Sequence, residues 1–101
     1  MSGEPTTEHY FEAHITIDPV EADDLEVRVI AGSLGFRIAE LLMKKTLDPS
    51  KLDTFMTAKS KHFTDIDSRT KRAVSLLQSN GYNVRRYKIE NILVDERLAR
   101  V

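Results

Sequence analysis

The sequence predicts a single α+β domain, because two amphipathic helical segments are interspersed with segments of strand-like alternation. A length of 101 residues is enough for one hydrophobic core. Hydrophobic residues make up 41% of the chain and charged residues 31%, a globular balance that excludes collagen-like and wholly disordered classes. The domain is expected to span residues 9–94, between a disordered N-terminal segment at 1–8 and a C-terminal tail at 95–101.

The first strand is predicted over residues 10–17 and is the clearest strand of the chain. Apolar side chains recur at every second position, at Phe11, Ala13, Ile15 and Ile17. This period of two is typical of a strand that buries one face.

A helix is predicted to begin at Asp18, because residues 18–21 place an N-cap acid, a proline and a glutamate in the order of a helix start. The helix is expected to end near Gly32 or Gly35. Its apolar face is expected at Ala22, Leu25, Val29 and Ile30.

A hairpin is predicted next, with strands over residues 36–45 and 53–59 and a loop that contains residues 48–50. The first of these strands follows a glycine and is a short apolar run, although its residues are also good helix formers. In the second strand, Met56 and Ala58 are expected in the core.

The second helix is predicted over residues 65–80, with Thr64 or Asp65 as its N-cap and Gly81 at its C-terminal end. Its buried face is expected at Ile66, Thr70, Ala73, Val74 and Leu77. The last strand is predicted over residues 83–93, with Tyr87 and Ile89 on its buried side.

This order of elements, strand-helix-strand-strand-helix-strand, resembles the ferredoxin-like fold. The resemblance implies a four-stranded antiparallel sheet with both helices on one face. Right-handed crossovers are expected to place the first and third strands in the middle of the sheet, with the fourth beside the first. The other face of the sheet would then be open to solvent or to a partner.

Strand alternation assigns a polar set of side chains to this open face. The first strand contributes His14 as a hypothetical catalytic residue, because imidazole transfers protons near neutral pH. Hydroxyls and cations at this density suit a phosphate or carboxylate, although solvated sheet faces are also commonly rich in these residue types. The candidate binding residues on the three strands are Glu12, Thr16, Thr57, Lys59, Arg86 and Lys88.

The charges are divided unequally along the chain. Residues 1–50 hold ten acids and four bases, residues 51–101 hold six acids and eleven bases, and the resulting −6 and +5 sum to the net charge of −1. The two halves can neutralise each other within one fold or across a symmetric dimer. Alternatively, the basic half presents a surface to an anionic partner.

The absence of certain residues and motifs argues against several kinds of protein and of binding site. There is no cysteine, which excludes disulfides and thiolate chemistry and favours a cytoplasmic location. No segment approaches the roughly 18 apolar residues of a membrane span, so no membrane partner is expected. The four glycines form no phosphate-binding loop, and His14 with Glu12 supplies only two metal ligands, so we expect neither a cofactor nor a metal.

Residues 13–17, with the sequence Ala-His-Ile-Thr-Ile, resemble the histidine-containing strand of the two-histidine phosphoesterase superfamily. A second His-x-Thr element lies at residues 62–64. The resemblance implies that His14 acts as a general acid or base and that Thr16 holds the phosphate of a cyclic or 2′,3′-phosphate substrate.

Three functions therefore compete. The first is the binding of an anionic ligand, namely a nucleotide, a phosphate ester or RNA, on the open face. RNA is suggested by the predicted exposure of Tyr10 and Phe55 and by the basic run at residues 85–88, although the third strand lacks the aromatic-glycine pattern of RNA-recognition domains. The alternatives are a phosphoesterase that uses His14, and a homodimerising or protein-interaction module without chemistry.

Overall fold

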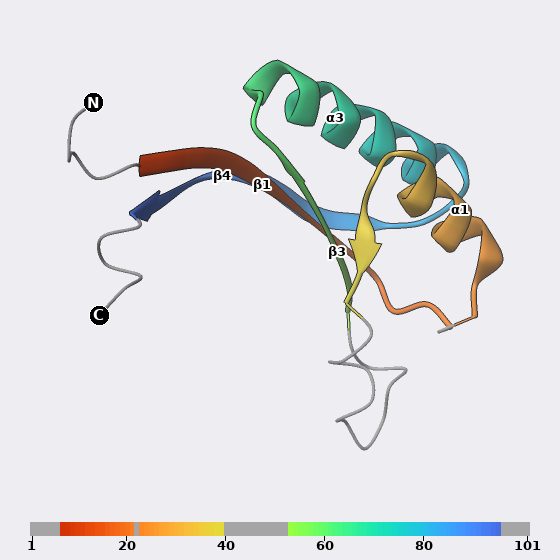
Figure 1. Ribbon diagram of the computed structural model, residues 1–101. Helices are drawn as coiled ribbons and strands as arrows, with labels where there is room; N and C mark the ends of the chain where they lie inside the picture. The colour runs from red at the N-terminus through yellow and green to blue at the C-terminus, as the bar shows by residue number, and fades with distance from the viewer. Residues whose placement is uncertain (1–6, 22, 40–52, 96–101) are drawn as a thin grey trace, which may run out of the picture.

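The structure is a computed structural model that describes residues 7–21, 23–39 and 53–95. Its four strands form one antiparallel sheet in the order β2-β3-β1-β4 (Figure 1). The α+β class, the order of the elements and the order of the strands confirm the prediction. The elements are β1 (Thr7–Ile17), α1 (Leu25–Ser33), β2 (Arg37–Ile38), β3 (Thr54–Ser60), α3 (Phe63–Ser79) and β4 (Val84–Asp95).

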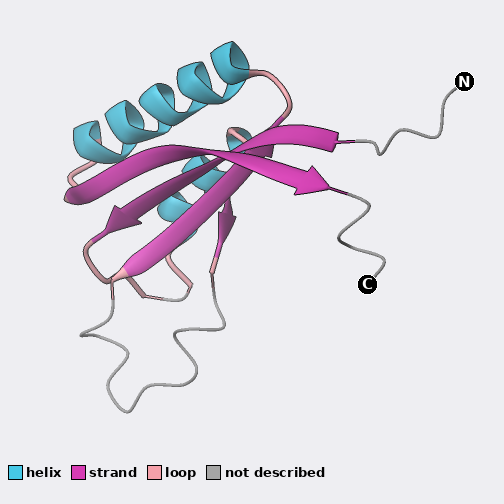
Figure 2. Ribbon diagram, turned by 90° about the vertical axis from the view of Figure 1, so that its left-hand side faces the viewer, coloured by secondary structure: helices cyan, strands magenta, loops and turns pink. Residues whose placement is uncertain are grey.

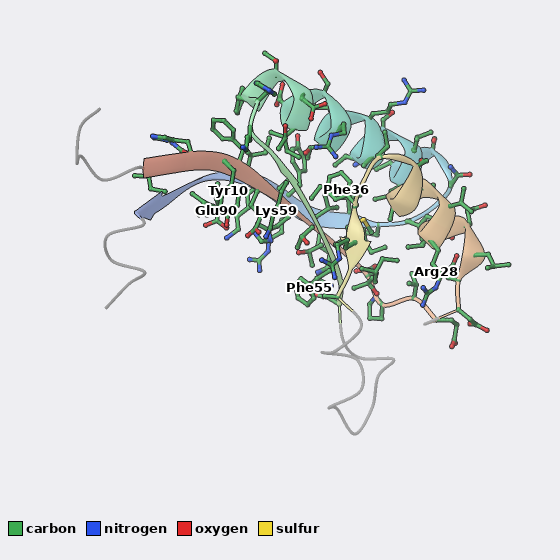
Figure 3. The ribbon with its side chains drawn as sticks, in the orientation of Figure 1. Tyr10, Arg28, Phe36, Phe55, Lys59 and Glu90 are labelled. Atoms are coloured by element: carbon green, nitrogen blue, oxygen red, sulfur yellow. The ribbon has the colours of Figure 1, made fainter. Side chains whose placement is uncertain are left out.

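Both described helices cover the same face of the sheet, as predicted (Figure 2). The core forms between this helical layer and the inward side chains of the strands, and Phe36 points into it (Figure 3). Burial of these apolar side chains is the main stabilising contribution to the fold. The core residues are Ala13, Ile15, Ile17, Val27, Ile30, Ala31, Phe36, Met56, Ala58, Ile66, Ala73, Val74 and Leu77.

The two longest strands continue beyond the helical layer as a ribbon (Figure 1). β1 pairs with β4 from Thr7 onwards, whereas its pairing with β3 begins only at Phe11. The rings of Phe11 and Phe63 pack in a T-shaped arrangement, with the ring centroids 5.5 Å apart. This contact marks the place where α3 stops covering the sheet.

Helix α1 begins six residues later than predicted, counted from N-cap to N-cap. Asp24 is its N-cap, and the Asp24 carboxylate accepts a hydrogen bond from the N–H of Val27 at 3.0 Å. The shorter helix turns a different face to the core. The predicted burial of Leu25 and Val29 was wrong, because both are exposed, whereas the predicted burial of Ile30 is confirmed. Ala22 lies outside the described residues.

Asp18 joins two strand ends instead of capping a helix. Its carboxylate accepts hydrogen bonds from the side-chain amide of Asn83 at 3.0 Å and from the guanidinium of Arg85 at 3.1 Å. These contacts lie next to a β-bulge, where Thr16 pairs with Arg86 and Ile17 pairs with Val84. Asp18, which the sequence predicts as a helix N-cap, therefore links the end of β1 to the start of β4.

The hairpin and the second helix follow the prediction closely where the structure describes them. The five residues predicted for the buried face of α3 are its buried residues, and Gly81 after the helix has a φ of +89°. The N-cap prediction was wrong, because the helix begins after His62, whose side chain makes no capping bond. Residues 40–45 of the predicted strand and the loop at 48–50 lie outside the described residues.

Arg69 ties α3 to two other segments, and we call this set of contacts the Arg69 clamp. The guanidinium donates to the carbonyl oxygens of Leu34 and Lys59, each at 2.9 Å, and to the Asp65 carboxylate at 3.0 Å. Gly35, which has a φ of +77°, lies so close that an added Cβ would be 2.6 Å from Nη1 of Arg69. Glycine at position 35 therefore leaves room for the clamp.

Replacing the cap of α1 tests the corrected start of that helix. The Asp24 carboxylate also accepts hydrogen bonds from the Tyr82 hydroxyl at 3.0 and 3.1 Å. Burial and the neighbouring Asp24 carboxylate raise the pKa of Tyr82, so its hydroxyl remains a donor. We expect Asp24→Ala to lower the free energy of unfolding by about 1–2 kcal/mol in urea denaturation. Asp23→Ala is the control, with an expected change below about 0.5 kcal/mol, and equal losses in the two variants would contradict the assignment.

Asp65 makes stability depend on acid pH. The Ser60 hydroxyl and the Arg69 guanidinium hold the pKa of Asp65 below its ordinary value of 3.8. A lowered folded pKa adds stability above pH 3.8 that is lost as the pH falls through the folded value. We therefore expect Asp65→Asn to flatten the acid side of a plot of urea midpoint against pH. Asp67→Asn, which removes only a pair with Lys71 on the same helix, should leave that slope in place, and an unchanged slope in Asp65→Asn would refute the linkage.

Candidate functional site

The face of the sheet opposite the helices, here called the open face, carries every residue predicted for the site. Cross-strand pairing arranges these side chains in three rows. The arginine row is Phe55, Thr16 and Arg86; the histidine row is Arg37, Thr57, His14 and Lys88; the glutamate row is Lys59, Glu12 and Glu90. Strand alternation alone was therefore sufficient to predict on which face of the sheet these side chains lie.

His14 lies between two carboxylates. Its Nε2 atom is 3.1 Å from Oε1 of Glu12 and 3.1 Å from Oε1 of Glu90. The same atom is buried and has no hydrogen-bond partner, so the two contacts have ion-pair distance without hydrogen-bond alignment. Glu12 and Glu90 are direct cross-strand neighbours and repel each other.

Two lysines complete the charge balance of this cluster. Nζ of Lys88 is 3.5 Å from Oε1 of Glu90, and Nζ of Lys59 is 3.9 Å from Oε2 of Glu12. The Lys59 ammonium also lies 5.4 Å from the centroid of the Tyr10 ring, and Tyr10, Lys59 and Glu90 gather on the side of the sheet away from α3 (Figure 3). The glutamate row is therefore a neutralised network, and Tyr10 already has a cation as its ring partner.

The other end of the open face is basic. Arg86 and Arg37 are exposed, and within the part of the chain that the structure describes neither forms an ion pair. The adjacent Arg85 is engaged instead, at 3.1 Å from Asp18 and 3.6 Å from Asp53. The β-bulge separates the two neighbouring arginines, leaving Arg86 in the arginine row.

Arg37 also lies on the open face, and the sequence analysis did not include it among the candidate residues. β2 places it opposite Thr57, in line with His14 and Lys88. The alternation of buried Phe36, exposed Arg37 and half-buried Ile38 is short but has the period of a strand. Extending the parity argument to the start of the predicted strand would have assigned Arg37 to the open face.

Two predicted contact residues are less accessible than strand parity implied. Thr16 lies on the open-face side of β1 but is only 5% exposed, between Phe55 and Arg86 of the same row. Thr57 is half-buried. Phe55, also half-buried, points away from the helical layer (Figure 3). The accessible groups at the basic end of the open face are thus the ring of Phe55 and the guanidinium groups of Arg37 and Arg86.

The assignment of Tyr87 to the core was wrong. Tyr87 lies on the helical side of β4, but it is 50% exposed. β4 is the outermost strand, and the helices do not extend over this side chain. Parity fixes the side of the sheet on which a residue lies, whereas burial also needs a covering layer.

The two His-x-Thr elements do not meet. His14 pairs with Thr57 in the middle of the sheet, whereas His62 precedes α3 and Thr64 lies in the first turn of that helix. The structure therefore places the two elements in different parts of the fold.

Neither a metal centre nor a membrane span is found in the described part of the chain. No cluster of three or more histidine and acidic side chains there has an arrangement suited to a metal ion. No helix within those same residues has both the length and the apolar character needed to cross a bilayer.

Comparison with known proteins assigns no family. No protein-family model matches the chain, and no curated protein matches it. One solved structure, described as the structural genomics protein YJCS, aligns with a TM-score of 0.41 and 15% sequence identity. The alignment covers 86% of this chain and 99% of the other. A TM-score of this size supports no conclusion about function.

Proposed function

We propose that the basic end of the open face binds a phosphate-bearing ligand, either single-stranded RNA or a nucleotide. The observation that carries the proposal is that Arg37 and Arg86, on the two outer strands, form no ion pair among the described residues. Guanidinium groups recognise phosphate oxygens through paired hydrogen bonds. Arg69 and Arg85, in contrast, are engaged within the fold, Arg69 by the Leu34 carbonyl oxygen and Arg85 by the Asp18 carboxylate.

The layout of this end favours a ligand with more than one phosphate. Arg37 and the β4 cations Arg86 and Lys88 are separated by three strand spacings, about 14 Å between backbones at about 4.8 Å per spacing. Phe55 lies between them and offers a ring on which a base can stack. Successive phosphates can then contact the two outer strands while a base contacts the middle.

The glutamate row limits the site on its other side. Glu12 and Glu90 are balanced by His14, Lys59 and Lys88, but their carboxylates disfavour an anion directly above them. The proposed site therefore includes Arg37, Phe55, Thr57, Arg86 and Lys88. Glu12, His14 and Lys59, which the sequence also nominated, form its boundary, whereas Thr16 lies buried between Phe55 and Arg86.

Binding to a fluorescent single-stranded RNA oligonucleotide tests the proposal. We expect anisotropy to report binding that weakens as salt rises, because phosphate contacts release counterions. Arg86→Ala should weaken binding several-fold and reduce the slope of log affinity against log salt by about 0.7 to 1, the value of one lost contact. Arg72→Ala, an exposed arginine of α3, is the matched control.

The proposal is wrong if binding is insensitive to salt, or if the two arginine variants lose the same affinity. Competition separates the two ligand classes. Displacement of the RNA by a nucleoside triphosphate at similar concentration would identify a nucleotide site, whereas displacement only by longer oligonucleotides would identify RNA.

A second proposal is hydrolysis of a 2′,3′-cyclic phosphate by His14, favoured by the Glu12 carboxylate 3.1 Å from its ring. Turnover requires that Nε2 leaves the two carboxylates or that Nδ1 transfers the proton. We expect His14→Gln to lower turnover of a 2′,3′-cyclic nucleotide by about 10²-fold or more. His62→Gln should not change turnover, since His62 precedes α3. Full activity in His14→Gln would exclude this site as the catalytic one.

A further inference from the structure

β4 is an uncovered edge of the sheet. It is 12 residues long and ends the strand order, so no strand described by the structure lies on its outer side. Half of its backbone N–H and C=O groups therefore face outward without a strand partner. Long exposed edge strands are templates for pairing with another strand.

The side chains of β4 add an apolar strip to this edge. On the helical side of the strand, Tyr87 is 50% exposed and Leu93 is 61% exposed. Between them, Ile89 is half-buried against the core and Asn91 is exposed, so a polar residue interrupts the strip before Leu93. These apolar groups lie at the side where a further strand would pair.

We propose that β4 pairs in antiparallel fashion with β4 of a second copy of the chain, about a two-fold axis at Ile89. In this register Lys88 lies opposite Glu90 of the second copy, and Glu90 lies opposite Lys88 of that copy. Two complementary charge pairs form on the open face. On the helical side, Tyr87 lies diagonally next to Ile89 and Leu93 of the second copy, within the reach of an aromatic side chain.

Charge excludes the neighbouring registers. A two-fold axis perpendicular to the sheet must pass through a residue pair of one face, because opposing residues in an antiparallel pair lie on the same face. An axis at Lys88 places the two lysines opposite each other, and an axis at Glu90 does the same with the two glutamates. Like charges in direct opposition are destabilising. An axis at Lys88 also pairs Arg86 with Glu90, so of these three positions Ile89 alone pairs opposite charges without opposing like charges.

In the resulting dimer the described strands of both copies form one continuous sheet, with the described helices of both copies on the same side. The open faces of the two copies then join. The row of Arg37, Thr57, His14 and Lys88 continues into Glu90, Glu12 and Lys59 of the second copy. This interface uses the edge of β4 and does not depend on the proposed ligand.

Sedimentation of charge variants tests the interface and its register. We expect the unmodified chain to be a dimer and Lys88→Glu to raise the dissociation constant about tenfold, because both pairs become glutamate against glutamate. Adding Glu90→Lys to that variant should restore the dimer, since the pairs are then reversed. Arg72→Glu is a control with the same change in charge on α3, and circular dichroism verifies that each variant is folded.

A cysteine at the axis gives an independent measurement, because the chain has no cysteine of its own. Cα atoms of directly opposed residues lie about 4.5–5.5 Å apart, a separation that a disulfide can join. We expect Ile89→Cys to form a covalent dimer on mild oxidation and Ser79→Cys, an exposed position of α3, to remain uncoupled. A monomeric unmodified chain would overturn the proposal and leave this edge to a strand of another protein. So would equal effects of Lys88→Glu and Arg72→Glu, or the absence of a cross-link at position 89.

Discussion

The pairing of β1 with strands on both of its sides is the constraint on which the molecule depends. From Phe11 to Ile17 the strand is held by β3 and β4 together, so its register is fixed from two directions. Ala13, Ile15 and Ile17 then lie fully buried under the helices. A slip of one residue would exchange them with Glu12 and His14 and bury charge in the core. The core and the open face are thus determined by the same alternation.

The open face is electrostatically divided although the chain is nearly neutral. At one end two glutamates and two lysines neutralise one another around His14 through direct contacts. At the other end Arg37 and Arg86 lie without such partners among the described residues. The net charge conceals this division because the two ends lie on one surface.

Regular alternation and helical periodicity predicted most of the fold, and contacts between distant residues explain the rest. The buried face of α3 followed directly from the spacing of apolar residues such as Ile66 and Leu77. The start of α1 could not be predicted, because Asp18 is bound by Asn83 and Arg85, more than 60 residues away in sequence. The open-face set was predicted by parity, but the enclosure of Nε2 of His14 depends on Glu90 of another strand. Burial of Thr16 and exposure of Tyr87 likewise depend on neighbouring or covering residues, which local sequence patterns do not contain.

The Arg69 clamp has a consequence for the order in which the chain becomes rigid. Its partners at Leu34 and Lys59 are 35 and 10 residues away in sequence, so neither bond can form inside an isolated helix. The Arg69 clamp can form only after the segment that follows α1, the end of β3 and α3 have come together. The entropic cost of closing both intervening stretches of chain is therefore met before its hydrogen bonds form. These three pieces should therefore open as one cooperative unit, whereas the projecting ribbon of β1 and β4 can fray separately from it.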